Sequence, residues 1–173
     1  MAIQKTILLG ENVLRETAKS VENTEDQRVQ EVITDLVDSM RDKDLIGMAA
    51  PQIGVSLRIF VTEVRETEYR KVDLDELRVY INPKITNKSE GTKIGWEGCG
   101  SIPGLFGQVE RYTEITVAYT DREGASQTDT VGGFLAVVIQ HETDHLDGIM
   151  FTDISDPKTF VSGAYYIKHI RSK

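Results

Sequence analysis

Cysteine is almost missing from this sequence, because Cys99 is the only one among 173 residues. A lone thiol cannot form an internal disulfide, so nothing indicates an oxidising compartment, and we expect a cytoplasmic protein. Long apolar runs are missing as well. No stretch approaches the roughly 20 residues that span a bilayer, and Ile7–Leu9 is too short for a secretory signal. We therefore expect no association with membranes.

An excess of positive charge is missing too, since the formal net charge at pH 7 is -8. Proteins that bind nucleic acid need a basic face, so we expect no DNA partner. The sequence contains no repeats, no low-complexity tract and no linker rich in Gly, Pro or Ser. Its length suits one hydrophobic core, and we expect residues 1–173 to form a single, monomeric domain.

Apolar residues recur at helical spacing between residues 25 and 42, which predicts a helix that docks on the core by one face. We expect a shorter helix over Asn12–Val21. The segment Gly47–Gly54 consists mainly of small residues, and Pro51 restricts the residue before it to extended conformations. This segment is therefore predicted to be an irregular loop.

β-Branched and aromatic residues gather in short runs that we expect to be strands: 58–64, 79–82, 84–86 and 115–119. Turn chemistry follows at Asn82-Pro83 and at residues 121–124. Glycines crowd the stretch between residues 95 and 107, which indicates tight turns or close approach of backbone segments.

The pattern becomes helical again after Gly132-Gly133. Few polar residues precede His141, so this helix should be buried on most sides. Asp156 and Pro157 suit the N-cap and first turn of a last helix that reaches Arg171. The whole pattern predicts an α+β fold, with short antiparallel strands folded around a central helix and further helices at the N- and C-terminal ends.

The strongest functional signal is the run His141-Glu142-Thr143-Asp144-His145. Residues four apart lie on one face of a helix, so both imidazoles can bind the same metal ion. Glu142 lies beside them and can act on a water molecule without being a ligand. A surface helix that carries two histidines by chance is the alternative, but the apolar residues before His141 do not suit a surface position.

A catalytic metal ion usually has three protein ligands and one open position. No glutamate follows Glu142, and Phe151 occupies the position where some metalloproteases have a third histidine. Asp153 is a weak candidate, and His169 lies near the end of the last predicted helix, where a solvated role is expected. Cys99 is the best third ligand, because a thiolate binds Fe or Zn strongly.

Three motifs, in this order, resemble the signature motifs of peptide deformylases: G-M-A-A-P-Q-I-G at 47–54, W-E-G-C-G-S-I-P-G at 96–104 and Q-H-E-T-D-H-L-D-G at 140–148. The helices and strands around them also resemble that family, so the resemblance covers nearly the whole chain. It implies a metal-dependent hydrolase that removes the N-formyl group from the N-terminal formyl-methionine of nascent polypeptides and releases formate. It also implies one divalent metal ion, Fe(II) in the cell, with Zn, Ni or Co as substitutes.

Carried over residue by residue, the resemblance implies three metal ligands: Cys99, His141 and His145. It implies Glu142 as the acid/base, with the Gln52 side chain and the Gly100 backbone N–H as donors to the developing oxyanion. Two glycines would border the substrate backbone and three residues would build the methionine pocket: Gly47 and Gly98, then Ile46, Glu97 and Val138.

Two positions depart from the usual motifs of this family. Leu45 stands where the family usually has glycine, and Gly100 replaces the leucine that usually follows the ligand cysteine. The backbone N–H at position 100 survives, but glycine loosens the loop and removes apolar packing beside the metal. We therefore expect the metal site to persist, and the rate or substrate range to be that of a divergent member.

Two other functions stay open at this point. A small metallopeptidase or another amidohydrolase would use the same attacking hydroxide. A weakly active relative would bind N-terminal peptides without turning them over. A basic C-terminal end also has two interpretations, docking on the ribosome or, with more support, interaction with the C-terminus of the last helix; it comprises Lys168, His169, Arg171 and Lys173.

Overall fold

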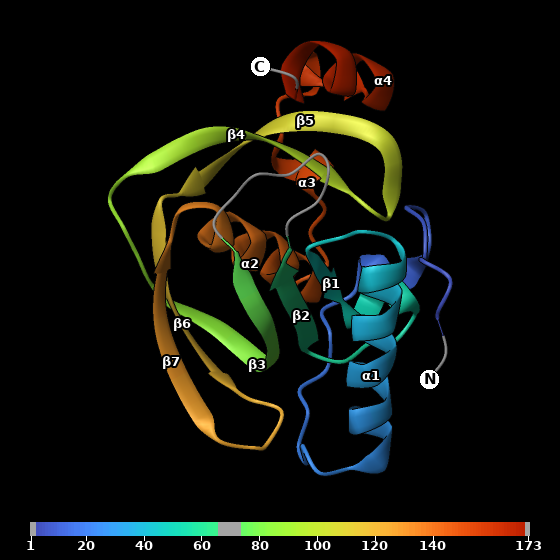
Figure 1. Cartoon of the computed structure of the whole chain (residues 1–173), viewed down its shortest axis with the longest axis vertical. Helices are drawn as coiled ribbons and strands as arrows, with labels where there is room; N and C mark the ends of the chain where they lie inside the picture. The colour runs from blue at the N-terminus through green and yellow to red at the C-terminus, as the bar shows by residue number, and fades with distance from the viewer. Residues whose placement is uncertain (1–2, 66–73, 172–173) are drawn as a thin grey trace.

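The computed structural model describes residues 3–65 and 74–171. Within them, the strands form two antiparallel sheets, one with the order β1-β2-β3-β6-β7 and the other with the order β4-β5-β8. Helix α2 runs through the centre, between the strands (Figure 1). This arrangement confirms the predicted α+β class, with antiparallel strands around a central helix.

The elements follow one another along the chain with these bounds. The strands are β1 Gly47–Ala49, β2 Ile59–Val64, β3 Asp75–Lys88, β4 Thr92–Cys99, β5 Ile102–Tyr112, β6 Glu114–Thr120, β7 Ser126–Gly132 and β8 Val161–Ser162. The helices are α1 Gln27–Asp42, α2 Gly133–Leu146, α3 Phe151–Ile154 and α4 Gly163–Tyr166. Shorter helical turns are η1 Asn12–Leu14, η2 Ala50–Ile53, η3 Pro157–Thr159 and η4 Ile167–Arg171.

The five-stranded sheet separates two hydrophobic cores. Successive side chains of a strand point to opposite faces, so Met48 and Val61 pack in one core with α1. Their neighbours Ala49 and Phe60 pack in the other core with α2. A third core lies against the second sheet and includes Phe151 of α3. The sheet therefore positions both helices, and β1 lies directly against α2.

Helix α1 confirms the helix predicted over residues 25–42. Its N-cap is Asp26, whose side chain accepts a hydrogen bond from the Arg28 backbone N–H. Its predicted apolar face is buried, with Ile33, Leu36 and Met40 each fully inaccessible to solvent. Strands β2 and β6 confirm the predictions at 58–64 and 115–119, and α2 confirms the buried central helix.

The helix predicted over Asn12–Val21 is wrong, because only the turn Asn12–Leu14 forms. The backbone groups that follow bond to distant segments instead of to each other. The Ala18 N–H donates to the Leu146 carbonyl at 2.8 Å, and the Lys19 carbonyl accepts from the Arg58 N–H at 2.7 Å. Tertiary hydrogen bonds thus replace the helix.

The last helix, predicted from Asp156 to Arg171, is wrong over its first half. Asp156 caps only a single turn, and Val161–Ser162 then pairs with β5. Helical structure begins at Gly163 and continues through α4 and the π-helical segment η4. Figure 1 shows this C-terminal segment at one end of the molecule, beside β5.

The strand predictions were incomplete. The runs at 79–82 and 84–86 are parts of one strand, β3, with a register shift at the expected Asn82-Pro83 turn. Asn82 adopts a positive φ of 50°, and its side chain bonds both the N–H and the carbonyl of Val21. Residues 47–49, expected in a loop, pair with β2, and strands β4, β5 and β7 were not predicted.

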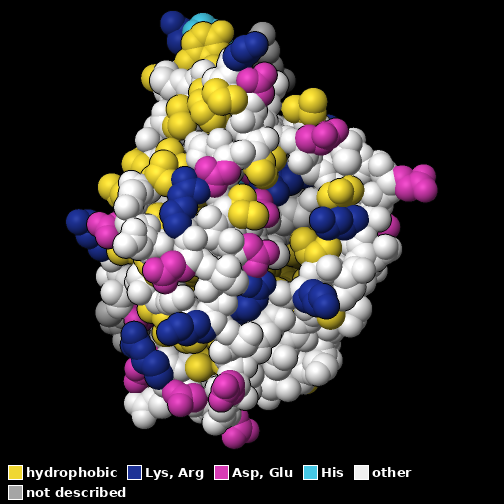
Figure 2. All heavy atoms as spheres, turned by 180° about the vertical axis from the view of Figure 1, so that it is seen from behind, with side chains coloured by type: hydrophobic (Ala, Val, Ile, Leu, Met, Phe, Trp, Pro, Cys, Tyr) yellow, Lys and Arg dark blue, Asp and Glu magenta, His cyan; other side chains and the backbone are white. Residues whose placement is uncertain are grey.

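Charged side chains of both signs are spread over the surface. Figure 2 shows acidic and basic side chains mixed over the rear face, with Lys, Arg and His side chains and hydrophobic groups at the end formed by α4. Across residues 3–65 and 74–171, no helix combines the length and the apolar character that crossing a membrane requires.

The core between α1 and the sheet generates the first prediction. Leu36→Ala should lower the free energy of unfolding by about 2–5 kcal/mol, because it removes fully buried atoms and leaves a cavity. Urea unfolding measures the change. The control Arg28→Ala truncates a side chain that is 64% exposed and should alter stability by less than about 0.5 kcal/mol. Equal stability of the two variants would contradict the proposed packing.

Candidate active site

Three side chains that could hold a metal ion converge from separate parts of the chain. Cys99 is the last residue of β4, where the chain turns towards β5. His141 and His145 project from successive turns of α2. The Cys99 Sγ lies 3.2 Å from His145 Nε2, and one ligand atom from each of the three residues lies within 4.8 Å of the others. The three side chains that the sequence singled out as ligands do come together.

A buried ionic network holds the His141 ring. Its Nδ1 lies 2.8 Å from Glu97 Oε2, and Arg111 donates two further hydrogen bonds to the same carboxylate. Arg111 also donates to Asp144 at 2.6 Å. Burial raises the pKa of Glu97, but hydrogen bonds from His141 and Arg111 outweigh it and lower that pKa to about 2. A carboxylate behind a histidine fixes the ring and leaves Nε2 available to a metal.

The surroundings of Cys99 favour its thiolate form. Burial raises the pKa of the thiol, but the neighbouring His145 and His141 outweigh this effect and bring the pKa well below its usual value. The Ser101 backbone N–H also donates to the sulfur, at 3.4 Å. The thiolate is the form that binds metals. A thiolate and two imidazoles together suit a borderline or soft divalent ion.

Glu142 lies beside these ligands and is 4% exposed. Burial raises its pKa to about 7, although the charges of His141 and His145 act in the opposite direction. Its Oε2 has no hydrogen-bond partner within residues 3–65 and 74–171. A Cβ at Gly47 would lie only 2.5 Å from the other carboxylate oxygen, so this glycine leaves the space that Glu142 occupies. A buried carboxylate needs a partner, and a water molecule at the metal would provide one.

The Gln52 amide is held in one orientation. Its Oε1 accepts a hydrogen bond from the Ala49 N–H at 2.8 Å. Its Nε2 therefore faces the metal ligands, 3.5 Å from Cys99 Sγ and 3.4 Å from Ser101 Oγ. Gln52 is 2% exposed, so this donor is fixed before any substrate arrives. Fixed donors of this kind stabilise negative charge that develops on a reacting oxygen.

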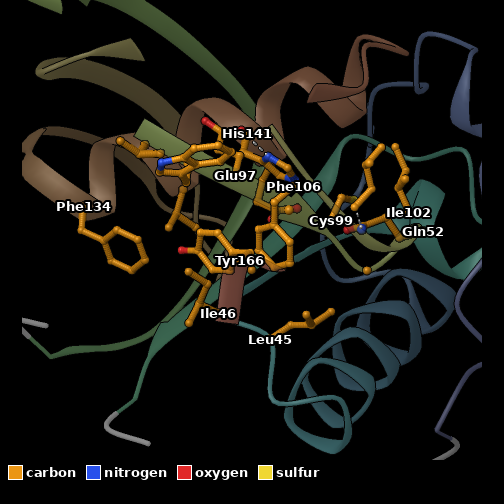
Figure 3. Close-up of a pocket in the computed structure, with 18 of the residues that line it drawn as sticks. Leu45, Ile46, Gln52, Glu97, Cys99, Ile102, Phe106, Phe134, His141 and Tyr166 are labelled. Atoms are coloured by element: carbon orange, nitrogen blue, oxygen red, sulfur yellow. Dashed lines mark hydrogen bonds and ion pairs between the residues drawn. The ribbon is translucent and has the colours of Figure 1, made fainter. Parts of the chain in front are cut away.

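Cys99 and His141 line one cavity of about 880 Å³ (Figure 3). All of the residues expected to contact the substrate line it: Ile46, Gly47, Glu97, Gly98 and Val138. Gln52, Gly100 and Glu142 line it as well. The two weaker ligand candidates lie elsewhere, because Asp153 pairs with Arg15 and His169 packs against the Tyr165 ring.

The sequence interpretation missed several residues at this site. Arg111 carried no signal, because a single arginine in an unpredicted strand has no recognisable pattern. The aromatic lining, which consists of Trp96, Phe106, Phe134 and Tyr166, was missed as well. These residues come from β4, β5, α2 and α4, so only the folded chain brings them together.

Comparisons with known proteins agree with this geometry. The family model described as polypeptide deformylase matches residues 3–160. A peptide deformylase of Pseudothermotoga lettingae is 43% identical over 152 residues, which cover 88% of this chain and 82% of that protein. The chain belongs to the peptide deformylase family. Members of this family are hydrolases that remove the formyl group from the N-termini of nascent polypeptides, and they depend on a metal ion.

Solved structures of this family have the same fold. A peptide deformylase from Legionella pneumophila superposes with a TM-score of 0.82 at 39% identity, covering 91% of this chain and 89% of that chain. A class I type b peptide deformylase from Acinetobacter baumannii, bound to Met-Ala-Ser, superposes with a TM-score of 0.85 at 29% identity. That alignment covers 88% of this chain and 98% of the Acinetobacter chain.

The two departures from the usual deformylase motifs meet in space. A Cβ at Gly100 would lie 2.9 Å from Leu45 Cδ1, so the Leu45 side chain occupies the volume beside Gly100. Leu45 thus supplies apolar packing beside Gly100 from the other side. The effect of Gly100 on rate and substrate range stays a prediction. Relative to the usual motifs, the leucine and the glycine have exchanged positions: leucine is at 45 and glycine is at 100.

This exchange predicts coupling between the two positions. Leu45→Gly alone should destabilise the chain by roughly 1–3 kcal/mol, because it opens a void and frees the backbone. Gly100→Leu alone should force the Leu45 side chain aside. The double variant should recover part of both losses, with a coupling energy of about 0.5–3 kcal/mol in urea unfolding. Strictly additive effects would show that the two positions are independent.

Proposed function

We propose that this chain hydrolyses the N-formyl group of N-terminal formyl-methionine on nascent polypeptides. Cys99, His141 and His145 bind the metal ion, and Glu142 is the general acid/base. The observation that carries this proposal is the buried Glu142 carboxylate beside three convergent ligand atoms, with one oxygen unpartnered among the described residues. A hydrolase needs such a group next to its metal to move protons.

We propose Fe(II) as the ion in the cell, with Zn, Ni or Co as substitutes, because a thiolate and two imidazoles accept all of these metals. When bound, the ion lowers the pKa of a water molecule and polarises the formyl carbonyl. Glu97 orients the His141 ring for ligation, and Arg111 keeps Glu97 ionised through its hydrogen bonds and charge. This orientation is the main role that we assign to Glu97, which also borders the methionine pocket.

Glu142 carries the proton through the reaction. It accepts a proton from the attacking water and later delivers it to the nitrogen of the leaving amine, which frees the new N-terminus. Its pKa of about 7 suits both transfers, because a group that accepts and then donates a proton works best near the ambient pH. Gly47 allows the carboxylate to occupy this position, because a side chain there would collide with it.

Two donors are assigned to the carbonyl oxygen of the formyl group, on which negative charge develops. One is the Gln52 Nε2, which is oriented by the bond between Gln52 and Ala49. The other is the backbone N–H of Gly100, which the glycine substitution does not remove. Loss of one such donor in comparable sites costs roughly 10²–10³ in rate.

The cavity accommodates the first residue of the substrate and its backbone. Ile46 and Val138 provide apolar walls for a methionine side chain, and Gly47 and Gly98 border the peptide backbone. The Acinetobacter relative binds Met-Ala-Ser, a peptide that begins with methionine. That observation supports a methionyl peptide as the occupant of this cavity. Leu45 fills the space beside Gly100, which supports an active enzyme over a weakly active, peptide-binding relative.

Several wider expectations belong to the same proposal. We propose a monomeric, cytoplasmic enzyme that works as one domain over residues 1–173. The basic C-terminal end stays a proposed ribosome contact. Its members Lys168, His169 and Arg171 lie in η4, where positive charge also favours the helix C-terminus, and Lys173 lies outside the described residues.

Glu142→Gln tests the chemical role of the carboxylate. The variant should keep its metal but lose about 10²–10⁴ in kcat for formate release, because the amide cannot accept a proton. Formate release from formyl-Met-Ala-Ser by anaerobic, metal-loaded protein measures this loss. The control Glu90→Gln changes an exposed carboxylate and should have wild-type activity. Wild-type protein that cleaves internal peptide bonds without releasing formate would indicate a peptidase instead.

Glu97→Gln tests the orientation of His141. Loss of the ionised carboxylate should weaken metal binding about 10- to 100-fold, as in other sites where the group behind a metal-binding histidine is removed. Competition with a chelator, followed by metal analysis of the protein, measures the affinity. Arg111→Lys should show a smaller loss, because it keeps the charge but not the bidentate geometry. Unchanged affinity in both variants would contradict the role of the network.

A further inference from the structure

The C-terminal segment, residues 161–171, contributes to the active-site cavity although the family-model match ends at residue 160. Strand β8 pairs with β5 through Leu105 and Ser162 and through Phe106 and Val161. Gly163 then packs closely on the backbone of Gly104. This pairing anchors α4 beside the cavity and brings Tyr166 to its lining.

Tyr166 is the outer member of a layered stack. Gly98 pairs with Phe106 across β4 and β5, and the Phe106 ring covers Gly98 so closely that a Cβ there would lie 2.7 Å from the ring. The Tyr166 ring stacks on Phe106 with centroids 4.0 Å apart and planes 5° from parallel. The Trp96 ring lies 6.0 Å from the Tyr166 ring. We call Trp96, Phe106 and Tyr166 the aromatic wall.

The position of the aromatic wall indicates which part of a substrate it contacts. In β4, Gly98 is the residue before the proposed metal ligand Cys99. Trp96 lies two residues before Gly98, so it is on the same face of the strand as Gly98. Gly98 is the residue proposed to border the substrate backbone. A peptide that places its formyl group at the ligands therefore extends past Gly98 towards the aromatic wall. Figure 3 shows Tyr166 beside Phe106 in this part of the cavity.

We propose that Tyr166 is a specificity-determining residue, which makes the aromatic wall a subsite for an apolar side chain downstream of formyl-methionine. This inference rests on the proposed function. The chemistry follows from the side chains, because aromatic faces gain free energy when they bury apolar groups. Tyr166 is partly buried, so its ring keeps an accessible edge for a substrate while Phe106 supports its face.

The test compares kcat and KM for formate release from formyl-Met-amide, formyl-Met-Ala-Ala and formyl-Met-Leu-Leu. Wild-type protein should prefer the leucine peptide to the alanine peptide. Tyr166→Ala should reduce that preference about 3- to 10-fold through KM, with little change in kcat, because the lost contact is made equally in the ground state and the transition state. Formyl-Met-amide has no downstream side chain, so its kinetics should stay unchanged.

Tyr165→Ala is the matched control, because Tyr165 is the adjacent residue of the same helix, is 51% exposed and packs on His169 rather than in the cavity. It should leave the preference intact, and Tyr166→Phe should retain it. Phe106→Leu alters the wall from β5 and should also reduce the preference, which covers the case that Tyr166→Ala frees α4. Equal preference in wild-type protein, Tyr165→Ala and both wall variants would overturn the inference.

A binding measurement separates this inference from the proposed function. Metal-loaded Glu142→Gln protein, with or without Tyr166→Ala, is titrated calorimetrically with the same leucine and alanine peptides. Weaker binding of the leucine peptide to the Tyr166 variant supports the subsite even when no formate is released. Absence of formate from every peptide with wild-type protein would overturn the proposed function. Equal affinities of the leucine peptide for Glu142→Gln protein with and without Tyr166→Ala would overturn the subsite alone.

Discussion

The buried carboxylate of Glu97 joins the second sheet to helix α2, and the geometry of the site depends on this connection. A buried charge is unfavourable unless several partners stabilise it. Arg111 of β5 provides two hydrogen bonds, and His141 of α2 provides another. Because Arg111 also pairs with Asp144, the network crosses from strand to helix twice. The distance between Cys99 on β4 and the histidines on α2 is therefore set by ion pairs as well as by packing.

The absence of a side chain at three glycines shapes the site, as the buried charges do. Gly47 leaves the space for the Glu142 carboxylate, and Gly98 leaves the space for the Phe106 ring. Gly100 leaves the space for Leu45. Each glycine lies in or next to one of the three motifs, and each neighbour comes from a different segment. The motifs therefore contain glycines that allow neighbouring side chains to approach closely, as well as residues that supply the chemistry.

The site also extends beyond the residues that the family model matches. The proposed ligands, acid/base and oxyanion donors all lie within residues 3–160. Tyr166 comes from the segment that follows and meets the cavity through β8. In the function that we propose, reaction type and substrate preference have separate origins. The chemistry needs donors held at the metal, while the preference needs only an apolar wall at the edge of the cavity.

The sequence by itself determined helix α1, the buried helix α2 and the three candidate metal ligands. Those features follow from periodicity and from the spacing of His141, Glu142 and His145, which are local properties of the chain. Only the tertiary structure decided where Asn12–Val21 and residues 156–162 place their hydrogen bonds, because their partners are distant in sequence. The same reason applies to Arg111, to the aromatic wall and to the exchange between Leu45 and Gly100. The roles of these residues depend on contacts between distant parts of the chain, and no local sequence pattern encodes such contacts.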